Sequence, residues 1–256
     1  MLLLIDSGNT NVVFAVHDGE KPLASWRCGN DPRRTADEYA VWLSQLMSLK
    51  GYKFDDIESC VIASVVPETL FNLKRLCEKY VPKPMLVVGE KGTELGIQIL
   101  IDRPEQVGAD RLVGVIAAHV KYGGPLMVLD FGTATSFDIA DENGNFRGGV
   151  LAPGVHQSVE ALYMAARKLP RVEIAKPETV IGRATVPAMQ SGIYWGYLSM
   201  VEGLISRIQA EYGEPMKVIA TGGLSALFAD ATDAIHVTDP DLTLTGLVEI
   251  YRRNSR

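Results

Sequence analysis

Two segments of the chain place a carboxylate, a glycine and hydroxyl or amide side chains directly after an apolar run. The first is Asp6 with Ser7-Gly8-Asn9-Thr10-Asn11, and the second is Asp130 with Phe131-Gly132-Thr133-Ala134. A glycine lets backbone N–H groups approach an anion closely, and a lone carboxylate beside such donors suits a phosphate bridged by Mg²⁺. A polar β-turn without a ligand explains either segment alone equally well. Nearly half of the 256 residues separate the two copies, which favours two similar lobes that each present a hairpin turn to a phosphate or a cation.

Two further segments have the residue types of a binding or catalytic site. Asp110 follows Gly108-Ala109 early in a predicted helix and precedes Arg111, so its carboxylate is placed to accept a proton from a substrate hydroxyl. An Asp–Arg surface pair, favoured in a first turn by the helix dipole, is the alternative. Thr221-Gly222-Gly223 joins a predicted strand to a short helix. There a ring or ribose can lie against the backbone, although a tight turn with positive φ explains the glycines too.

The hydrophobic pattern predicts a similar order of elements in each half of the chain. Thr35 and Glu38 form a capping box ahead of a helix that ends near Lys50. The other first-half elements are strands at 2–6, 11–17, 22–28, 59–64 and 85–88 and helices at 67–80 and 104–122. The second half has strands at 125–130, 134–140, 146–151, 216–220 and 234–237, helices at 155–166, 187–212 and 242–252, and a loop at 167–186. This order predicts an α/β fold of two lobes, 1–118 and 119–256, each with a mixed sheet flanked by helices.

Composition limits the expected partners and location. The net charge is −6 and no basic run is present, so we expect no nucleic-acid partner. Three cysteines without CxxC spacing are typical of reduced thiols in a cytoplasmic protein. The four histidines have no metal-ligand spacing. The chain shows no signal peptide and no apolar run of about 20 residues, so we expect no membrane association.

Taken in order, these motifs resemble those of known families. DxGNT at 6–10, DFGTA at 130–134 and TGG at 221–223 resemble the two phosphate motifs and the adenosine motif of the actin-like ATPase superfamily of sugar kinases, Hsp70 and actin. With GADR at 108–111, GGVLAPG at 148–154 and AMQSG at 188–192, the chain is similar to type III pantothenate kinases along essentially its whole length. The resemblance implies two duplicated actin-like (ribonuclease H-like) lobes with the active site in the cleft between them.

The resemblance also implies an activity, cofactors and roles for particular residues. The activity is ATP-dependent phosphorylation of pantothenate to 4'-phosphopantothenate, the first step of coenzyme A biosynthesis, with Mg²⁺ and a monovalent cation, K⁺ or NH₄⁺. Asp110 would be the general base, Asp130 would help to hold the monovalent cation, and Asp6 would meet Mg²⁺ through phosphate. The implied ATP-binding residues are Asp6, Ser7, Gly8, Asn9, Thr10, Asn11, Val12, Val13 and Thr133. The implied substrate-binding residues are Gly108, Ala109, Asp110, Arg111 and Thr185.

Several expectations stay open at this point. The family commonly has a substrate-contacting Tyr shortly before GADR, where this chain has Leu100-Ile101-Asp102. We therefore expect either an aliphatic pocket wall or a contact from elsewhere. The family is dimeric, and the helix 187–212, with Tyr194, Trp195, Tyr197 and Met200 clustered, is a candidate interface. The alternatives are a kinase of the same fold for another small hydroxyl compound and a non-catalytic ATP-binding regulator. Thr185 can equally serve as a helix N-cap.

Overall fold

The computed structural model describes residues 1–165 and 169–255, and the chain divides into two compact units. The first unit comprises Met1–Val120 and Asp241–Arg256, and the second comprises Lys121–Pro240. The expected lobes, 1–118 and 119–256, differ from these units mainly at the carboxyl terminus, where the last helix packs with the first unit.

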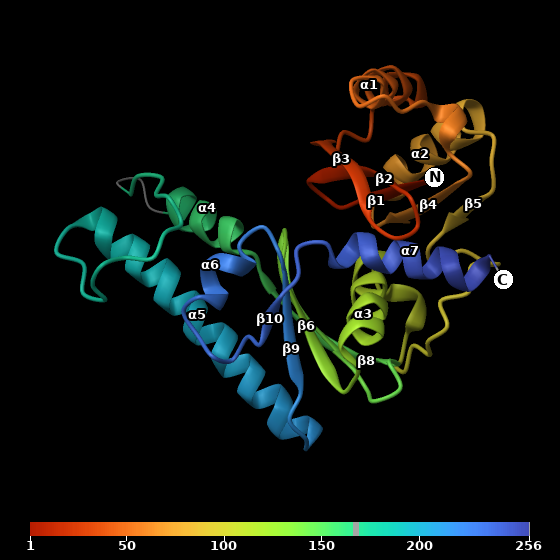
Figure 1. Cartoon of the computed structure of the whole chain (residues 1–256). Coiled ribbons are helices and arrows are strands. Elements are labelled where there is room, and N and C mark those ends of the chain that lie inside the picture. Colours follow the sequence, from red (N-terminus) through yellow and green to blue (C-terminus); the bar gives the residue numbers. More distant parts are fainter. Residues whose placement is uncertain (166–168, 256) are drawn as a thin grey trace. The chain divides into compact units, whose positions relative to one another are not determined.

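The first unit is built on a five-stranded mixed sheet in the order β3-β2-β1-β4-β5 (Figure 1). Its strands are β1 (Leu2–Ser7), β2 (Asn11–His17), β3 (Pro22–Gly29), β4 (Ser59–Ser64) and β5 (Met85–Val87). The first three strands form an antiparallel meander, whereas β4 is parallel to β1 and β5 is parallel to β4. Because β1 is buried on both faces, it has a continuous apolar run rather than an alternating pattern.

Helices cover both faces of this sheet. α1 (Ala36–Ser48) and α2 (Pro67–Tyr80) pack on the face that carries Leu3 and Ile5 (Figure 1). The predicted capping box is present, since the Thr35 hydroxyl accepts from the Glu38 N–H and the Glu38 carboxylate accepts from the Thr35 N–H. Both helices therefore begin at the signals that the sequence provides, a capping box for α1 and Pro67 in the first turn of α2.

The opposite face of the sheet carries the last helix of the chain, which was expected in the second lobe. α3 (Ala109–Tyr122) and α7 (Leu242–Asn254) share a core there with Leu2 and Leu4, and α7 packs against β1 and β4. The two helices meet at Gly246, where an added Cβ would fall 2.2 Å from the carbonyl oxygen of Val113. The contact requires a glycine, and it joins the carboxyl terminus to the first unit.

The second unit repeats the strand order of the first. Its sheet has the order β10-β9-β6-β7-β8, with β6, β7 and β8 antiparallel and β9 parallel to β6. These strands are β6 (Leu126–Phe131), β7 (Ala134–Ala140), β8 (Phe146–Pro153), β9 (Lys217–Gly222) and β10 (Val237–Thr238). Counted from the edge strand of the meander, each sheet has three antiparallel strands followed by two parallel strands. The duplication predicted from the two Asp hairpins is therefore present in the topology.

One core of the second unit lies between the sheet and its helices, which are α4 (Val155–Ala165), α5 (Thr185–Tyr212) and α6 (Ser225–Ala229) (Figure 1). Phe131 stacks on Phe228 at 5.1 Å between ring centroids, and Tyr194 also stacks on Phe228, at 5.4 Å. Tyr194 and Tyr197 are buried in this core. The expectation that they form a subunit interface is wrong for these two side chains, because their rings pack within their own unit.

Some boundaries differ from the sequence-based ones. The predicted helix 104–122 is a 3₁₀ turn at Pro104–Gln106 followed by α3, because Val107 takes an extended conformation (φ −76°, ψ 126°). Thr185 is the first residue of α5 rather than its N-cap, which is Ala184. Residues 166–168, where the predicted helix 155–166 ends and the predicted loop 167–186 begins, lie outside the described residues. Within the described ranges no helix is both long and apolar enough to cross a bilayer.

Candidate active site

The turn between β1 and β2 is exposed at its tip, and residues 8–10 are called the open turn. The Gly8 N–H donates to the carbonyl oxygen of Asn11 at 3.0 Å, while Asn9 and Thr10 are exposed. An added Cβ on Gly8 would meet only the Asn11 carbonyl oxygen, at an ordinary 3.7 Å, and Gly8 has no positive φ. Nothing inside the described fold therefore requires glycine at this position. Glycine here leaves room for a ligand to approach the backbone.

The remaining residues of this predicted ATP segment differ in exposure. Ser7 is buried, and Asn11 and Val13 are half-buried. Val12 is fully buried in the core between the sheet and α1 and α2. Its side chain is therefore closed to a nucleotide, whereas the turn at 8–10 is open.

Asn30, which the sequence reasoning missed, is attached to this turn at several points. Its side-chain Nδ2 donates to the carbonyl oxygen of Gly8 at 2.6 Å and to the hydroxyl of Ser7 at 3.3 Å. Its backbone N–H donates to the carbonyl oxygen of Thr10 at 2.9 Å. Its Oδ1 accepts from the buried hydroxyl of Thr69, in the first turn of α2, at 2.6 Å. The open turn is thus held from one side by a residue that follows β3.

Two carboxylates of the first unit interact. Asp6 lies near the end of β1, between Val13 of β2 and Ala63 of β4. Burial raises the pKa of Asp6 from 3.8 to about 7, and the charge of Asp110 adds to the rise while Arg27 opposes it. Folding therefore brings the Asp of the first hairpin near the Asp of the GADR segment.

Asp110 is positioned by its own segment. Its Oδ1 accepts the Arg111 N–H at 2.8 Å. Burial raises the pKa of Asp110, and the hydrogen bond and charge of Arg111 oppose that rise. An added Cβ on Gly108 would fall 2.6 Å from Asp110 Oδ1, so Gly108 leaves the space that the carboxylate occupies. A half-buried carboxylate with a raised pKa suits a general base.

In the second unit, the DFGTA and TGG motifs meet. Asp130 of β6 is paired with Thr221 of β9, and Phe131 is paired with Gly222. Gly222 has φ +88°, and an added Cβ there would fall 2.5 Å from Asp130 Oδ1 and 2.6 Å from the Phe131 carbonyl oxygen. The turn with positive φ is therefore the correct explanation of Gly222. An added Cβ on Gly223 would have no atom within 4 Å, so this second glycine is free to face a ligand.

Thr133 lies on the exposed turn between β6 and β7, and that turn is tied to the start of α4. An added Cβ on Gly154 would fall 2.2 Å from the Thr133 carbonyl oxygen, so the GGVLAPG segment packs tightly against DFGTA. Tyr197 of α5 donates to the Pro153 carbonyl oxygen at 2.9 Å and contacts the hydroxyl of Thr135. The phenol of Tyr197 therefore fixes the ends of β7 and β8 beside the predicted nucleotide contact.

Thr185 lies at a cavity of the second unit. It is exposed and lines a largely apolar cavity of about 700 Å³ between α4 and α5, together with Leu162, Met189, Gly192 and Tyr197. Arg111, on the first unit, is half-buried and follows Asp110 in α3. The structure thus groups the predicted residues into one set on each unit.

The oxygen ligands of these sets fit the implied cations. Among the described residues no three His, Cys, Asp or Glu side chains gather in a metal cluster. Mg²⁺ in kinases is commonly held by one or two carboxylates plus substrate phosphates and water, which the Asp6 end of β1 can supply. Asp130 Oδ1 and the Phe131 carbonyl oxygen both lie beside Gly222, and paired carboxylate and carbonyl oxygens suit a monovalent cation.

Sequence reasoning missed Asn30 and Thr69 as contributors to the site and assigned Tyr197 to an interface. The only local signal for Asn30 was a turn-forming residue after a strand, and Thr69 lies in an ordinary amphipathic helix. Their hydrogen bonds span 22 to 39 residues, and no local pattern encodes such pairs.

Comparison with known proteins decides the family. The model described as type III pantothenate kinase matches residues 2–207. The chain belongs to the type III pantothenate kinase family. A type III pantothenate kinase from Rhodospirillum rubrum is 60% identical over 254 residues, which is 99% of this chain and 99% of that relative.

Solved structures share the fold at low identity. A Baf family transcriptional activator candidate from Campylobacter jejuni superposes with a TM-score of 0.61 at 18% identity, covering 99% of this chain and 98% of its own. A 2-dehydro-3-deoxygalactonokinase candidate from Sinorhizobium meliloti gives 0.59 at 13% identity, covering 99% and 96%. These likenesses concern the fold alone, and with the repeated strand order they confirm two duplicated actin-like lobes.

Proposed function

We propose that the chain transfers the γ-phosphoryl group of ATP to the primary hydroxyl of pantothenate, which forms 4'-phosphopantothenate at the start of coenzyme A biosynthesis. The observation that carries the chemistry is the placement of Asp110 at the start of α3, where the Arg111 N–H donates to its Oδ1 at 2.8 Å and Gly108 leaves space for the carboxylate. The charge of Asp110 also raises the pKa of Asp6. Membership of the type III pantothenate kinase family supports the substrate.

In this proposal Asp110 is the general base. Burial raises the pKa of Asp110 toward the range in which a carboxylate accepts a proton effectively, and the Arg111 N–H orients one of its oxygens. Gly108 and Ala109 would line the substrate beside it. Arg111 would either anchor pantothenate or offset charge on the transferring phosphoryl group, since a guanidinium can do both.

The nucleotide would lie against backbone rather than against long side chains. The exposed tip of the turn would bind phosphate through backbone N–H groups such as that of Asn9, and Thr133 and Gly223 would contact ATP from the second unit. Mg²⁺, when bound, would neutralise charge on the phosphate oxygens near Asp6. Asp130 would hold K⁺ or NH₄⁺ with the Phe131 carbonyl oxygen. Thr185 would be a further substrate contact.

The proposal extends to assembly and location. We place the enzyme in the cytoplasm as a homodimer, as the family resemblance implies. Tyr194 and Tyr197 are excluded from the interface because they are buried. The candidate interface residues are instead exposed apolar side chains near the start of α5 and in α4, such as Val186, Met164 and Leu162.

A substrate panel tests the proposal. ADP formation is followed with ATP, Mg²⁺ and K⁺, with pantothenate present, absent, or replaced by other small hydroxyl compounds. We expect ADP only with pantothenate. ADP with another compound alone would establish the rival kinase, which the missing Tyr at 100–102 favours, and no acceptor-dependent ADP together with ATP binding would establish the non-catalytic regulator. Replacing K⁺ by Na⁺ should lower the rate, and Asp130→Asn should remove that dependence.

A further inference from the structure

We propose that Asn30 and Thr69 are positioning residues for the nucleotide phosphates, with the Thr69 hydroxyl orienting the Asn30 amide and that amide holding the open turn in its phosphate-binding shape. The inference rests on the proposed function, because it assigns a role within the same ATP site. Neither residue belongs to a motif on which the family resemblance rests.

The orientation of the Asn30 amide follows from its neighbours. The Gly8 carbonyl oxygen, 2.6 Å away, can only accept a hydrogen bond, so the amide must turn Nδ2 toward it. Oδ1 then faces Thr69, whose hydroxyl donates at 2.6 Å. Thr69 is 1% exposed, so this hydroxyl has no exchange with bulk water and its hydrogen bond is costly to lose.

The hydrogen bond from Asn30 to the Gly8 carbonyl sets the direction of the Asn9 N–H. The carbonyl of Gly8 and the N–H of Asn9 belong to one planar trans peptide and point to opposite sides. When Asn30 binds the carbonyl on one side, the Asn9 N–H is turned to the side away from Asn30. A second bond, from the Asn30 N–H to the Thr10 carbonyl oxygen at 2.9 Å, fixes the other end of the turn. The turn is thus pre-shaped, which lowers the ordering cost of binding an anion.

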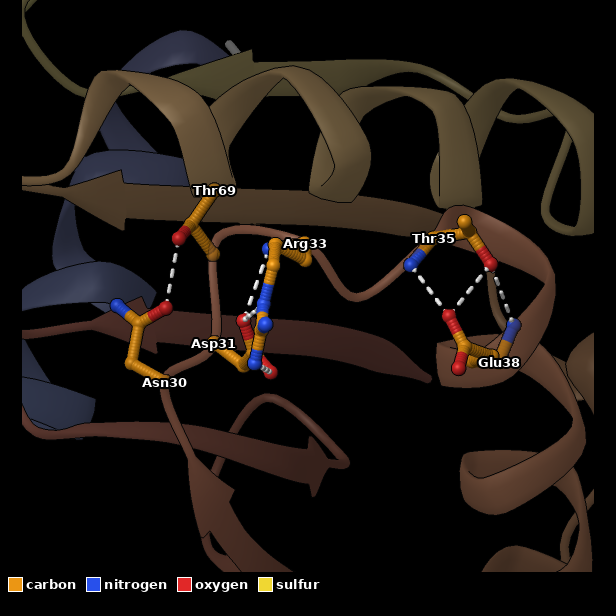
Figure 2. Close-up of polar contacts among 6 residues, drawn as sticks. All are labelled: Asn30, Asp31, Arg33, Thr35, Glu38 and Thr69. Atoms are coloured by element: carbon orange, nitrogen blue, oxygen red, sulfur yellow. Dashed lines mark hydrogen bonds and ion pairs between the residues drawn. The ribbon is translucent and has the colours of Figure 1, made fainter.

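The segment that follows Asn30 has local hydrogen bonds of its own. The carboxylate of Asp31 accepts from the backbone N–H of Arg33 at 3.0 Å and pairs with its guanidinium (Figure 2). The Thr35–Glu38 capping box then begins α1. Asn30 therefore lies between the end of β3 and a rigid helix start, while Thr69 comes from α2. Neither residue needs to touch the substrate to affect it.

A purely structural role is the alternative, and the variants separate the two. Thr69→Val keeps the shape and removes the hydroxyl, Thr69→Ser keeps the hydroxyl, and Asn30→Asp places an acceptor against the Gly8 carbonyl. Ser59→Ala is the matched control, because the Ser59 hydroxyl is also buried in the first unit and donates to the Pro84 carbonyl oxygen at 2.9 Å. Each protein is assayed for ATP affinity by calorimetry without pantothenate, for both KM values, and for thermal stability.

We expect Thr69→Val to weaken ATP binding and raise KM for ATP by about 3- to 10-fold, the equivalent of one lost hydrogen bond. KM for pantothenate should stay within about twofold of wild type by the same reasoning. Thr69→Ser should restore ATP affinity, and Asn30→Asp should lower it further than Thr69→Val. Ser59→Ala should leave ATP affinity unchanged even where it lowers stability.

Equal losses of ATP affinity in Thr69→Val and Ser59→Ala would overturn the inference, as would a loss of stability in Thr69→Val without any change in ATP affinity. If the wild-type protein binds ATP but does not phosphorylate pantothenate, the proposed function fails while the calorimetric shifts still decide this inference. A wild-type protein that binds no ATP would overturn both.

Discussion

The charge of Asp110 contributes to the raised pKa of Asp6, although more than a hundred residues separate them in the chain. Asp6 lies near the end of β1 and Asp110 in the first turn of α3, and both elements share the core that α7 completes. The interaction places a candidate base near a candidate phosphate and cation site within one unit.

Asp110→Asn removes the base and keeps the size of the side chain. We expect kcat to fall by about 10²- to 10⁴-fold, the usual contribution of general-base catalysis. ATP affinity, measured by calorimetry, should change less than threefold (an order-of-magnitude limit), because the open turn is untouched. A loss of ATP affinity as large as the loss of kcat would refute the assignment of Asp110 as the base.

Asp6→Asn tests the raised pKa through stability. The pKa of Asp6 in the folded protein is about 7, against an ordinary 3.8, so between these values the native state binds more protons than the unfolded state. The stability contribution of Asp6 therefore falls as pH rises from about 4 to about 7. The Asn variant should be more stable than wild type at pH 8, by at most about 4 kcal/mol, and the gain should vanish near pH 4.

Urea unfolding in EDTA at several pH values measures this difference. EDTA matters because a bound cation would favour the ionised form of Asp6 and hide the effect. A gain that is the same at pH 4 and pH 8 would show that Asp6 titrates normally.

Gly222→Ala and Gly223→Ala form a matched pair. At Gly222 the new methyl group meets Asp130 Oδ1 and a positive φ, so we expect a loss of more than about 2 kcal/mol in the free energy of unfolding. At Gly223 nothing lies within 4 Å of the new methyl group, so stability should change by less than about 1 kcal/mol. KM for ATP should nevertheless rise in Gly223→Ala. Equal stability losses in the two variants would contradict the separate roles given to these glycines.

Gly8→Ala tests whether a ligand binds at the open turn. The nearest atom to the new methyl group would be the Asn11 carbonyl oxygen at 3.7 Å, so the fold accommodates it and thermal unfolding should change little. A methyl group beside the phosphates would weaken ATP binding by about tenfold or more, since it keeps the anion from the backbone N–H groups. Unchanged ATP affinity would mean that no phosphate approaches this turn.

The sequence predicted what local patterns and a repeat can encode. The apolar runs of β1, β4 and β6, the capping box of α1 and Pro67 of α2 lie where predicted. The position of α7 was missed because its partners, β1 and β4, are more than 170 residues away. Its contacts with these strands, and the packing of Gly246 on Val113 of α3, appear only in the structure. Asn30, Thr69 and the inward phenol of Tyr197 were missed for the same reason. Their hydrogen-bond partners come from other elements.

Identification of the product tests the central claim most directly. The protein is incubated with ATP, Mg²⁺, K⁺ and pantothenate, and the products are separated and identified by mass spectrometry and ³¹P NMR. The account predicts one 4'-phosphopantothenate for each ADP formed, with neither product from Asp110→Asn above a trace. ADP without phosphopantothenate, or a phosphorylated product with Asp110→Asn at the wild-type rate, would contradict it.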